Sequence, residues 1–141
     1  MSEENKAIAR RLFGEGINEG NLSVADELVA PDFINHNPAR GATPDREGLK
    51  QYVTMLRSAF PDLHGTIEDQ IAEGDKVVLR MTFRGTHRGK LMGIPPTGKE
   101  LAVIAIGIFR FAGGKIVERW AITDELGMMQ QLGVIPTPGQ G

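Results

Sequence analysis

The stretch Lys76-Val-Val-Leu-Arg-Met-Thr-Phe-Arg84 decides the fold, because apolar side chains recur along it with a period of two. One face of the predicted strand is entirely apolar and consists of Val77, Leu79, Met81 and Phe83. The other face is mixed and consists of Val78, Arg80, Thr82 and Arg84. This pattern is typical of an antiparallel sheet that packs on a core with one face.

Further strands are predicted on both sides of this stretch, over residues 66–72, 100–111 and 116–124. Short turns at 73–75 and 113–114 join neighbouring strands, and the Gly113-Gly114 pair suits a tight hairpin. The segment 85–98 is dense in Gly and Pro, which predicts a long, partly ordered connection. The second half of the chain is therefore predicted to be an antiparallel meander.

The first third of the chain has a helical period. Predicted helices run from Ser2 to Gly20, over two turns from Ser23 to Pro31, and from Thr43, as the N-cap before Pro44, to Phe60. A turn-rich segment, 33–38, follows the second helix. Helices followed by a meander predict an α+β fold, in which a curved sheet around the helices forms a cone with an open, ligand-binding mouth.

Composition narrows the class of protein. The 141 residues have the length of one domain, with a core expected over about 4–135 and a loose tail at 136–141. The chain has no cysteine, which excludes disulfides and thiolate chemistry, and its net charge of -2 argues against a nucleic-acid partner. The acidic start and the lack of a long apolar stretch argue against a signal peptide or a membrane span, so we expect a cytoplasmic protein.

The segment Ile116-Val-Glu-Arg-Trp-Ala-Ile-Thr-Asp-Glu125 is the best source of catalytic candidates. Strict alternation predicts one shared face for Ile116, Glu118, Trp120, Ile122 and Asp124. If that face lines a cavity, the Asp124 carboxylate sits in an apolar setting that suits acid–base chemistry. An equally weighted alternative makes Asp124 the N-cap of a helix over 125–132, and both roles can coexist.

Several ordered blocks resemble a known family: Phe60-Pro-Asp-Leu63, Glu73-Gly-Asp-Lys-Val77, Gly85-Thr-His87, Gly93-Ile-Pro-Pro-Thr-Gly98 and the segment from Trp120 to Gly133. Across residues 4–135 the chain resembles the SnoaL-like polyketide cyclase or ester cyclase family of the nuclear-transport-factor-2-like superfamily. The resemblance implies a single SnoaL-like domain over 1–141 and a cystatin-like α+β barrel, in which a mixed sheet wraps around the N-terminal helices.

The resemblance also implies a reaction. Characterised cyclases of this family use a carboxylate in the cone as general acid and base for an intramolecular aldol ring closure, without metal or cofactor. Asp124 is the position that matches this carboxylate. The chain departs from the family at the neighbouring strand, where polar groups are expected to assist but Ala102-Val-Ile-Ala-Ile-Gly-Ile108 offers none.

Other polar residues are candidates to assist Asp124. His36, near the cavity mouth, can shuttle a proton, and Arg80 can pair with a substrate oxyanion. Their alternatives are a turn or surface histidine and an arginine on a solvent-facing strand surface. Residues expected to line the pocket are Trp120, Tyr52, Met55, Ile122 and His87, the last with a structural role as its main alternative. The three histidines lack the spacing of a metal site, and no phosphate cradle opens a helix, so we expect no metal and no cofactor.

Three functions remain open. The leading one is an isomerase- or lyase-type cyclase that acts on a small, largely apolar carbonyl compound. The alternatives are a noncatalytic small-molecule binding or assembly module and an epoxide-hydrolase-like enzyme. Both faces of the strand at 101–111 carry apolar groups, so we also expect a homodimer that covers the outer face of the sheet.

Overall fold

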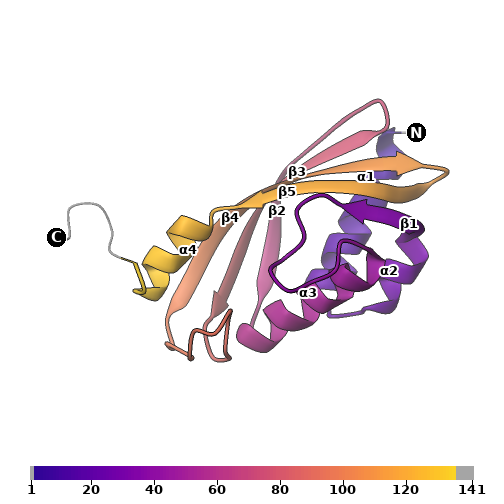
Figure 1. Ribbon diagram of the computed structural model, residues 1–141. Helices are drawn as coiled ribbons and strands as arrows, with labels where there is room; N and C mark the ends of the chain where they lie inside the picture. Colours follow the sequence, from indigo (N-terminus) through magenta and orange to yellow (C-terminus); the bar gives the residue numbers. More distant parts are fainter. Residues whose placement is uncertain (1, 136–141) are drawn as a thin grey trace.

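The computed structural model describes residues 2–135, which form helices packed on one mixed sheet. The sheet has five strands in the order β1-β5-β4-β3-β2, with β1 (Val29–Asn35) at one edge. The antiparallel meander consists of β2 (His64–Glu73), β3 (Lys76–Thr86), β4 (Glu100–Ala112) and β5 (Lys115–Thr123). The helices α1 (Ser2–Arg11), α2 (Ser23–Leu28) and α3 (Arg46–Ala59) cover one face of the curved sheet, and α4 (Glu125–Leu132) extends from its end (Figure 1). The predicted α+β fold is therefore confirmed.

The helical layer begins with α1 (Ser2–Arg11), which continues as a π-helical segment, η1 (Leu12–Asn18), and is followed by the two-turn α2 (Ser23–Leu28). Arg57 donates hydrogen bonds of 2.9 Å to the carbonyl oxygens of Ile17 and Asn18, which lack helical partners at this end. Asn18 also exchanges two hydrogen bonds with the backbone of Gly65 in β2. A Cβ at Gly65 would lie 2.4 Å from the Phe13 ring, so glycine allows the helix to reach the sheet.

Helix α3 (Arg46–Ala59) starts later than the sequence predicts. Its N-cap is Asp45, whose Oδ1 accepts a hydrogen bond of 3.0 Å from the Gly48 backbone, and the predicted cap Thr43 instead donates its hydroxyl to Asp45. The Pro44 carbonyl accepts a hydrogen bond from the Asn35 backbone, so Pro44 joins β1 to this helix start. The predicted start at Thr43 is therefore wrong by two residues.

The edge strand β1 (Val29–Asn35) was missed by sequence analysis. It pairs parallel to β5, with Val29 opposite Ile116 and Asn35 opposite Arg119. In the sequence Pro31 predicts the end of a helix, but an edge strand also tolerates proline because one row of its N–H groups has no sheet partner. The segment before His36 is thus extended backbone rather than a turn.

The inner face of the sheet and the first helix form the core. As predicted, Val77, Leu79 and Met81 of β3 point inward, and they pack with residues of α1, η1, β1 and β4. The outer face of β4 remains open, with Ile104 exposed by 53% and Ile106 by 48%. This division agrees with the alternation expected from the sequence.

The connection between β3 and β4 is ordered by hydrogen bonds to the end of α3. Arg88 and Gly89 donate their backbone N–H groups to the Ala59 carbonyl oxygen, and a Cβ at Gly89 would lie only 2.1 Å from the Ser58 carbonyl. Leu91 and Ile94 exchange two backbone hydrogen bonds around Met92, whose φ is 47°, and Gly93, whose φ is 81°. These angles define a tight two-residue turn.

Within residues 2–135, no helix has the length and apolar character that a membrane span requires. The loose tail expected at 136–141 lies outside the described residues.

Candidate active site

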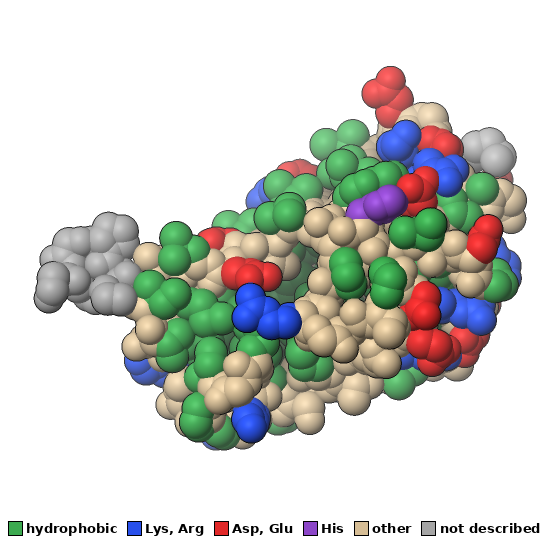
Figure 2. All heavy atoms as spheres, in the orientation of Figure 1, with side chains coloured by type: hydrophobic (Ala, Val, Ile, Leu, Met, Phe, Trp, Pro, Cys, Tyr) green, Lys and Arg blue, Asp and Glu red, His purple; other side chains and the backbone are tan. Residues whose placement is uncertain are grey.

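A cavity of about 670 Å³ opens where the end of β5 meets α3 and α4. Its wall comes from loop 37–40, from α3, from residues 91–92 and from the end of β5 with the start of α4. Hydrophobic side chains gather over α4 and the adjoining end of the sheet (Figure 2). A cavity of this volume accommodates an organic ligand of ordinary size.

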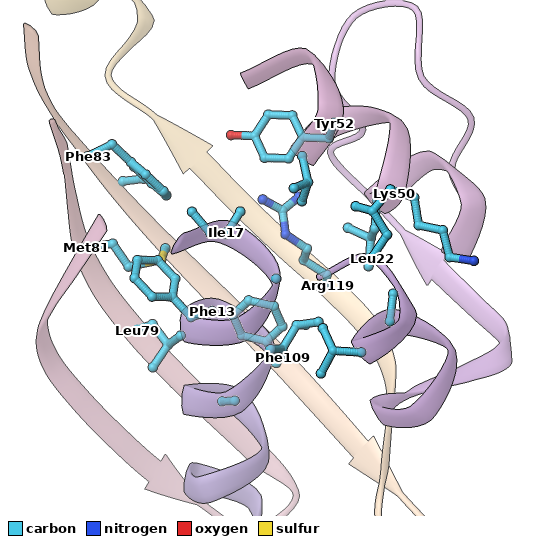
Figure 3. A pocket seen from close by; sticks show the side chains of 18 of the residues that line it. Phe13, Ile17, Leu22, Lys50, Tyr52, Leu79, Met81, Phe83, Phe109 and Arg119 are labelled. Carbon is cyan, nitrogen blue, oxygen red and sulfur yellow. The ribbon is translucent and has the colours of Figure 1, made fainter. Parts of the chain in front are cut away.

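A smaller cavity of about 80 Å³ lies between the helices and the inner face of the sheet (Figure 3). Its lining is mostly apolar and includes Phe13, Met81 and Phe109. Three residues line both cavities: Tyr52, Arg119 and Thr123. These polar side chains therefore form the boundary between an apolar interior and the larger cavity.

A β-bulge at Val117 decides which side chains of β5 reach the cavities. Ile116 pairs with Phe111 and Glu118 pairs with the adjacent Arg110, so Val117 is an extra residue in β5. An extra residue reverses the alternation of all side chains that follow it. The face predicted from strict alternation is therefore wrong beyond Ile116.

The reversal exchanges the two sets of β5 side chains. Arg119 and Thr123 point inward and line both cavities, whereas Trp120 lies on the outer face opposite Ile108. The prediction that Trp120 forms a wall of the cavity is thus wrong. Ile122 is also on the outer face, 70% exposed, although it contributes to the rim of the large cavity.

Arg119 is the cationic residue that lines both cavities, whereas Arg40 lines the large cavity alone. Its Nη1 donates to Asn35 Oδ1 at 3.1 Å and to the Asn37 carbonyl oxygen at 3.5 Å, and both acceptors are neutral. Its Cζ lies 5.8 Å from the centroid of the Tyr52 ring, toward which the guanidinium points in Figure 3. Burial lowers the pKa of Arg119 below its ordinary value, yet an arginine remains charged near neutral pH.

Tyr52 projects from α3 toward Arg119. Burial is the main cause that raises the pKa of Tyr52, and the nearby Arg119 charge and a hydrogen bond with the Thr123 side chain act in the opposite direction. The phenol therefore stays protonated near neutral pH and offers an O–H donor to the cavity. Met55, one turn further along α3, lies in the wall of the large cavity.

Asp124 both caps a helix and contributes to the wall of the large cavity. It is the N-cap of α4, where its Oδ1 accepts a hydrogen bond of 2.9 Å from the Gly127 backbone. Its side chain is exposed and also lines the large cavity, next to Glu125. The capping role expected from the sequence is therefore present, and it coexists with a position on the cavity wall.

His36 lies outside the cone, against the outer face of β5. Its ring stacks on Trp120 with centroids 4.7 Å apart and planes at 4°, and its Nε2 lies 2.7 Å from Glu118 Oε2. Arg110 binds the other oxygen of Glu118. The hydrogen bonds from His36 and Arg110 lower the pKa of Glu118 below its ordinary value. The expected place of His36 at the cavity mouth is wrong because β1 carries it past the sheet edge.

Arg80 is also on the outer face of the sheet. Its Nε donates to Asp69 Oδ2 at 2.5 Å, across the β2–β3 pair. The expectation that Arg80 assists catalysis in the cone is contradicted by this position, because the even-numbered residues of β3 point away from the core. The solvent-facing alternative describes Arg80 correctly.

His87 is fully buried and holds the β3–β4 connection rather than the cavity wall. Its Nδ1 accepts a hydrogen bond from the Thr97 backbone at 3.2 Å, and its ring packs on Phe60 at a centroid distance of 5.7 Å. Its Nε2 has no partner among the described residues. The prediction that His87 lines the pocket is therefore wrong. Its contacts with Thr97 and Phe60 agree with the alternative, a structural role.

Arg119 and Thr123 are the two polar residues lining both cavities that strict alternation does not place there. Strict alternation assigned both to the face opposite Trp120, and the sequence contains no signal for the bulge that turns this face inward. Among residues 2–135, no group of three or more His, Asp or Glu side chains is arranged to hold a metal ion. The large cavity thus combines the carboxylates of Asp124 and Glu125, the guanidinium groups of Arg40 and Arg119 and the Tyr52 phenol with apolar side chains.

Comparison with known proteins assigns this chain to a family. Residues 7–132 match the model of the SnoaL-like polyketide cyclases. The chain therefore belongs to the SnoaL-like polyketide cyclase family. Its curated relatives are cyclases, which makes this protein a cyclase-type enzyme.

Individual relatives agree with this class. The chain is 32% identical to aklanonic acid methyl ester cyclase DnrD of Streptomyces peucetius, with 93% of this chain and 92% of the relative covered. It is 30% identical to nogalonic acid methyl ester cyclase of Streptomyces nogalater, with 82% and 88% covered. The solved structure of TsrD from Streptomyces laurentii is similar with a TM-score of 0.86 and 32% identity, and 94% of this chain and 97% of that chain are covered.

Proposed function

We propose that this protein closes a carbon ring in a small, largely apolar carbonyl compound of polyketide type, with Asp124 as the acid–base group. The observation that carries the proposal is the cavity of about 670 Å³, whose wall includes the Asp124 carboxylate together with apolar side chains. Apolar walls suit the carbon skeleton of such a compound, and the carboxylate supplies a group that exchanges protons.

The proposed reaction needs only proton transfers and one new bond. The Asp124 carboxylate takes a proton from the carbon beside a carbonyl group, and the C–H electron pair moves into the resulting enolate. The enolate carbon then attacks a second carbonyl of the same molecule, which forms a C–C bond and an alkoxide. The protonated Asp124 returns its proton to the alkoxide, so substrate and product are isomers and the enzyme is regenerated.

The relatives support both the reaction class and a choice of probes. They are named as cyclases of aklanonic acid methyl ester and of nogalonic acid methyl ester. We therefore propose that the substrate of this chain is of the same chemical class, and these two esters are the first compounds to test. Ring closure is then followed as the appearance of an isomer, with unchanged mass and altered chromatographic retention.

Asp124→Asn separates the catalytic role of this residue from its capping role. Asparagine is also a good N-cap, so the variant should fold with nearly unchanged stability. Turnover of the ester should fall by about two to four powers of ten, because the amide cannot take up the proton. Steady-state rates from chromatography, with thermal unfolding as the folding check, measure both effects.

Asp45→Asn is the matched control. Asp45 caps α3 through a hydrogen bond of 3.0 Å to Gly48, just as Asp124 caps α4, but it does not contribute to the wall of the large cavity. The control should retain turnover. Full activity of Asp124→Asn, or an equal loss in both variants, would defeat the acid–base assignment and leave a binding role as the better account.

We further propose that two copies of the chain associate through the outer face of the sheet. Exposed apolar side chains cluster there in adjacent strands, with Ile106 of β4 opposite Ile122 of β5 and Ile104 nearby. Two ion pairs on the same face, Arg80 with Asp69 and Arg110 with Glu118, supply charges of both signs beside them. In a two-fold interface the same surface of each copy meets its counterpart. A patch with charges of both signs at its edges suits this symmetry, because a cation of one copy can meet an anion of the other.

A further inference from the structure

The guanidinium of Arg119 is half-buried and has no anionic partner among residues 2–135. Its hydrogen bonds to Asn35 and Asn37 use Nη1 and reach only neutral oxygens. Among the described residues, no carboxylate lies within ion-pair distance of it. Charged groups in protein interiors are normally paired, because the loss of hydration is otherwise uncompensated.

The unpaired side of Arg119 faces the cavities. The side chain lines both of them, and the hydrogen bonds made through Nη1 hold the guanidinium in one orientation, while Nε and Nη2 make no hydrogen bond to another described residue. Figure 3 shows the guanidinium among apolar side chains and directed toward Tyr52. A fixed fork of N–H donors matches a pair of oxygen atoms that share one negative charge.

We propose that Arg119 and the Tyr52 hydroxyl form an oxyanion site that binds a delocalised pair of oxygens on an otherwise apolar substrate. Two kinds of ligand carry such a pair of oxygens: the enolate of a β-dicarbonyl compound and a carboxylate. The inference rests on the proposed function in one respect, since the enolate would be the species formed when Asp124 removes the proton. Anion binding at Arg119 is a separate property and is tested separately.

The site would act by electrostatics. As the C–H proton moves to Asp124, negative charge develops on the carbonyl oxygens, and a positioned guanidinium stabilises that charge without reorganising. The phenol adds an O–H donor, because Tyr52 stays protonated. Apolar walls strengthen both interactions by keeping the local dielectric constant low. Arg119 thus supplies the polar assistance that the apolar strand β4 lacks.

Binding of 2-naphthoate and its neutral analogue 2-naphthamide, measured by calorimetry near neutral pH, tests the site. The protein should bind the anion more tightly than the amide by about 10- to 100-fold, the range expected for hydrogen bonds to a charged group. Arg119→Gln should abolish this preference, and Arg119→Lys should retain part of it because the charge remains without the fork. Arg80→Gln, on the outer face of the sheet, is the matched control and should leave the preference unchanged.

Benzoylacetone, a β-dicarbonyl compound, shows whether the ligand that supplies the two oxygens is an enolate or a carboxylate. Its enolate absorbs at a longer wavelength than its neutral forms, so an absorbance titration gives the pKa of the bound compound. A pKa lowered by the wild-type protein and not by Arg119→Gln assigns the site to enolates. A preference for naphthoate with an unchanged benzoylacetone pKa assigns it to carboxylates.

The proposal is overturned if wild-type protein binds naphthoate and naphthamide equally and leaves the pKa of benzoylacetone unchanged, or if Arg119→Gln behaves like wild-type protein toward both probes. If Arg119→Gln does not fold, the Arg119 side-chain NH signal in NMR spectra of the wild-type protein decides, since naphthoate should shift it and naphthamide should not. Asp124→Asn distinguishes this inference from the proposed function. It should lose turnover and keep the anion preference, and either property can fail without the other.

Discussion

At the residue scale, the contact between Tyr52 and Arg119 determines the chemistry of the cavity. Each side chain alone would be an unusual choice for an apolar interior, since one carries a charge and the other a hydroxyl that needs a partner. Together they place a cation 5.8 Å from an aromatic ring, and both side chains line the two cavities. This pair distinguishes the site from a simple hydrophobic pocket.

The titration of Tyr52 gives a direct test, because it is the only tyrosine of the chain. Burial raises its pKa, so phenolate absorbance should appear at higher pH in the folded protein than in the chain unfolded by denaturant. Arg119→Gln removes a positive charge that favours phenolate and should move the titration higher still. A folded-state titration equal to that of the unfolded chain would contradict the burial of the phenol.

The same shift has a consequence for stability. A group whose pKa is raised on folding contributes stability that is present below its unfolded value, about 10 for tyrosine, and that is lost as the pH rises through the folded value. The wild-type protein should therefore lose unfolding free energy in this alkaline range. Tyr52→Phe should show a shallower loss, measurable by denaturant unfolding at a series of pH values.

At the scale of elements, the β3–β4 connection shapes the mouth of the large cavity. The turn at Met92 and Gly93 presents Met92 to the cavity, at a positive φ of 47°. Hydrogen bonds from His87 to Lys99 and from Gly98 to His87 hold the two ends of the connection together. An ordered loop thus forms part of the wall, and a strained side-chain position is kept at the opening.

Met92→Asn should relieve this strain, because asparagine is preferred over methionine in the left-handed region of a two-residue hairpin turn. We expect the free energy of unfolding to rise by up to about 1 kcal/mol. Met55→Asn is the control: it removes similar apolar surface from the same cavity, but in α3 and without a positive φ, and should be destabilising. A decrease of the thermal midpoint in both variants would show that packing of Met92, not its backbone, dominates.

At the scale of the whole molecule, the curved sheet has two faces with different roles. The inner face, with the helices, encloses the apolar interior and the cavities. The outer face carries Ile104 and Ile106, which are exposed in a single chain, together with the half-buried Trp120 and the His36 ring stacked on it. Such an apolar surface is typical of a contact between proteins.

Ile106→Glu tests the proposed dimer. Wild-type protein at micromolar concentration should scatter light as a particle of twice the 15.3 kDa mass of one chain, and the variant as a single chain, because the charge would be buried at the interface. Ala112→Glu adds the same charge to β4 outside the isoleucine patch and should remain dimeric. A wild-type mass of one chain would remove the basis for the dimer.

Local patterns in the sequence determined most of the elements. The period of two in β3 and β4, the amphipathic first helix and the glycine turn at 113–114 depend on neighbouring residues, so they were recognisable without a partner. The N-cap at Asp124 is equally local, since the acceptor and donor are three residues apart. Edge strand β1 was missed because its only support is a pairing with β5, which is distant in the sequence.

The tertiary structure alone decided what enters the cavity. One extra residue at Val117 turns Arg119 inward and Trp120 outward, and a bulge of this kind depends on the register between β4 and β5 rather than on the composition of either strand. The sequence therefore determined that a carboxylate stands at the end of a strand in a cyclase-like cone. Only the pairing of strands decided that a guanidinium, not an indole, faces the cavity that this carboxylate lines.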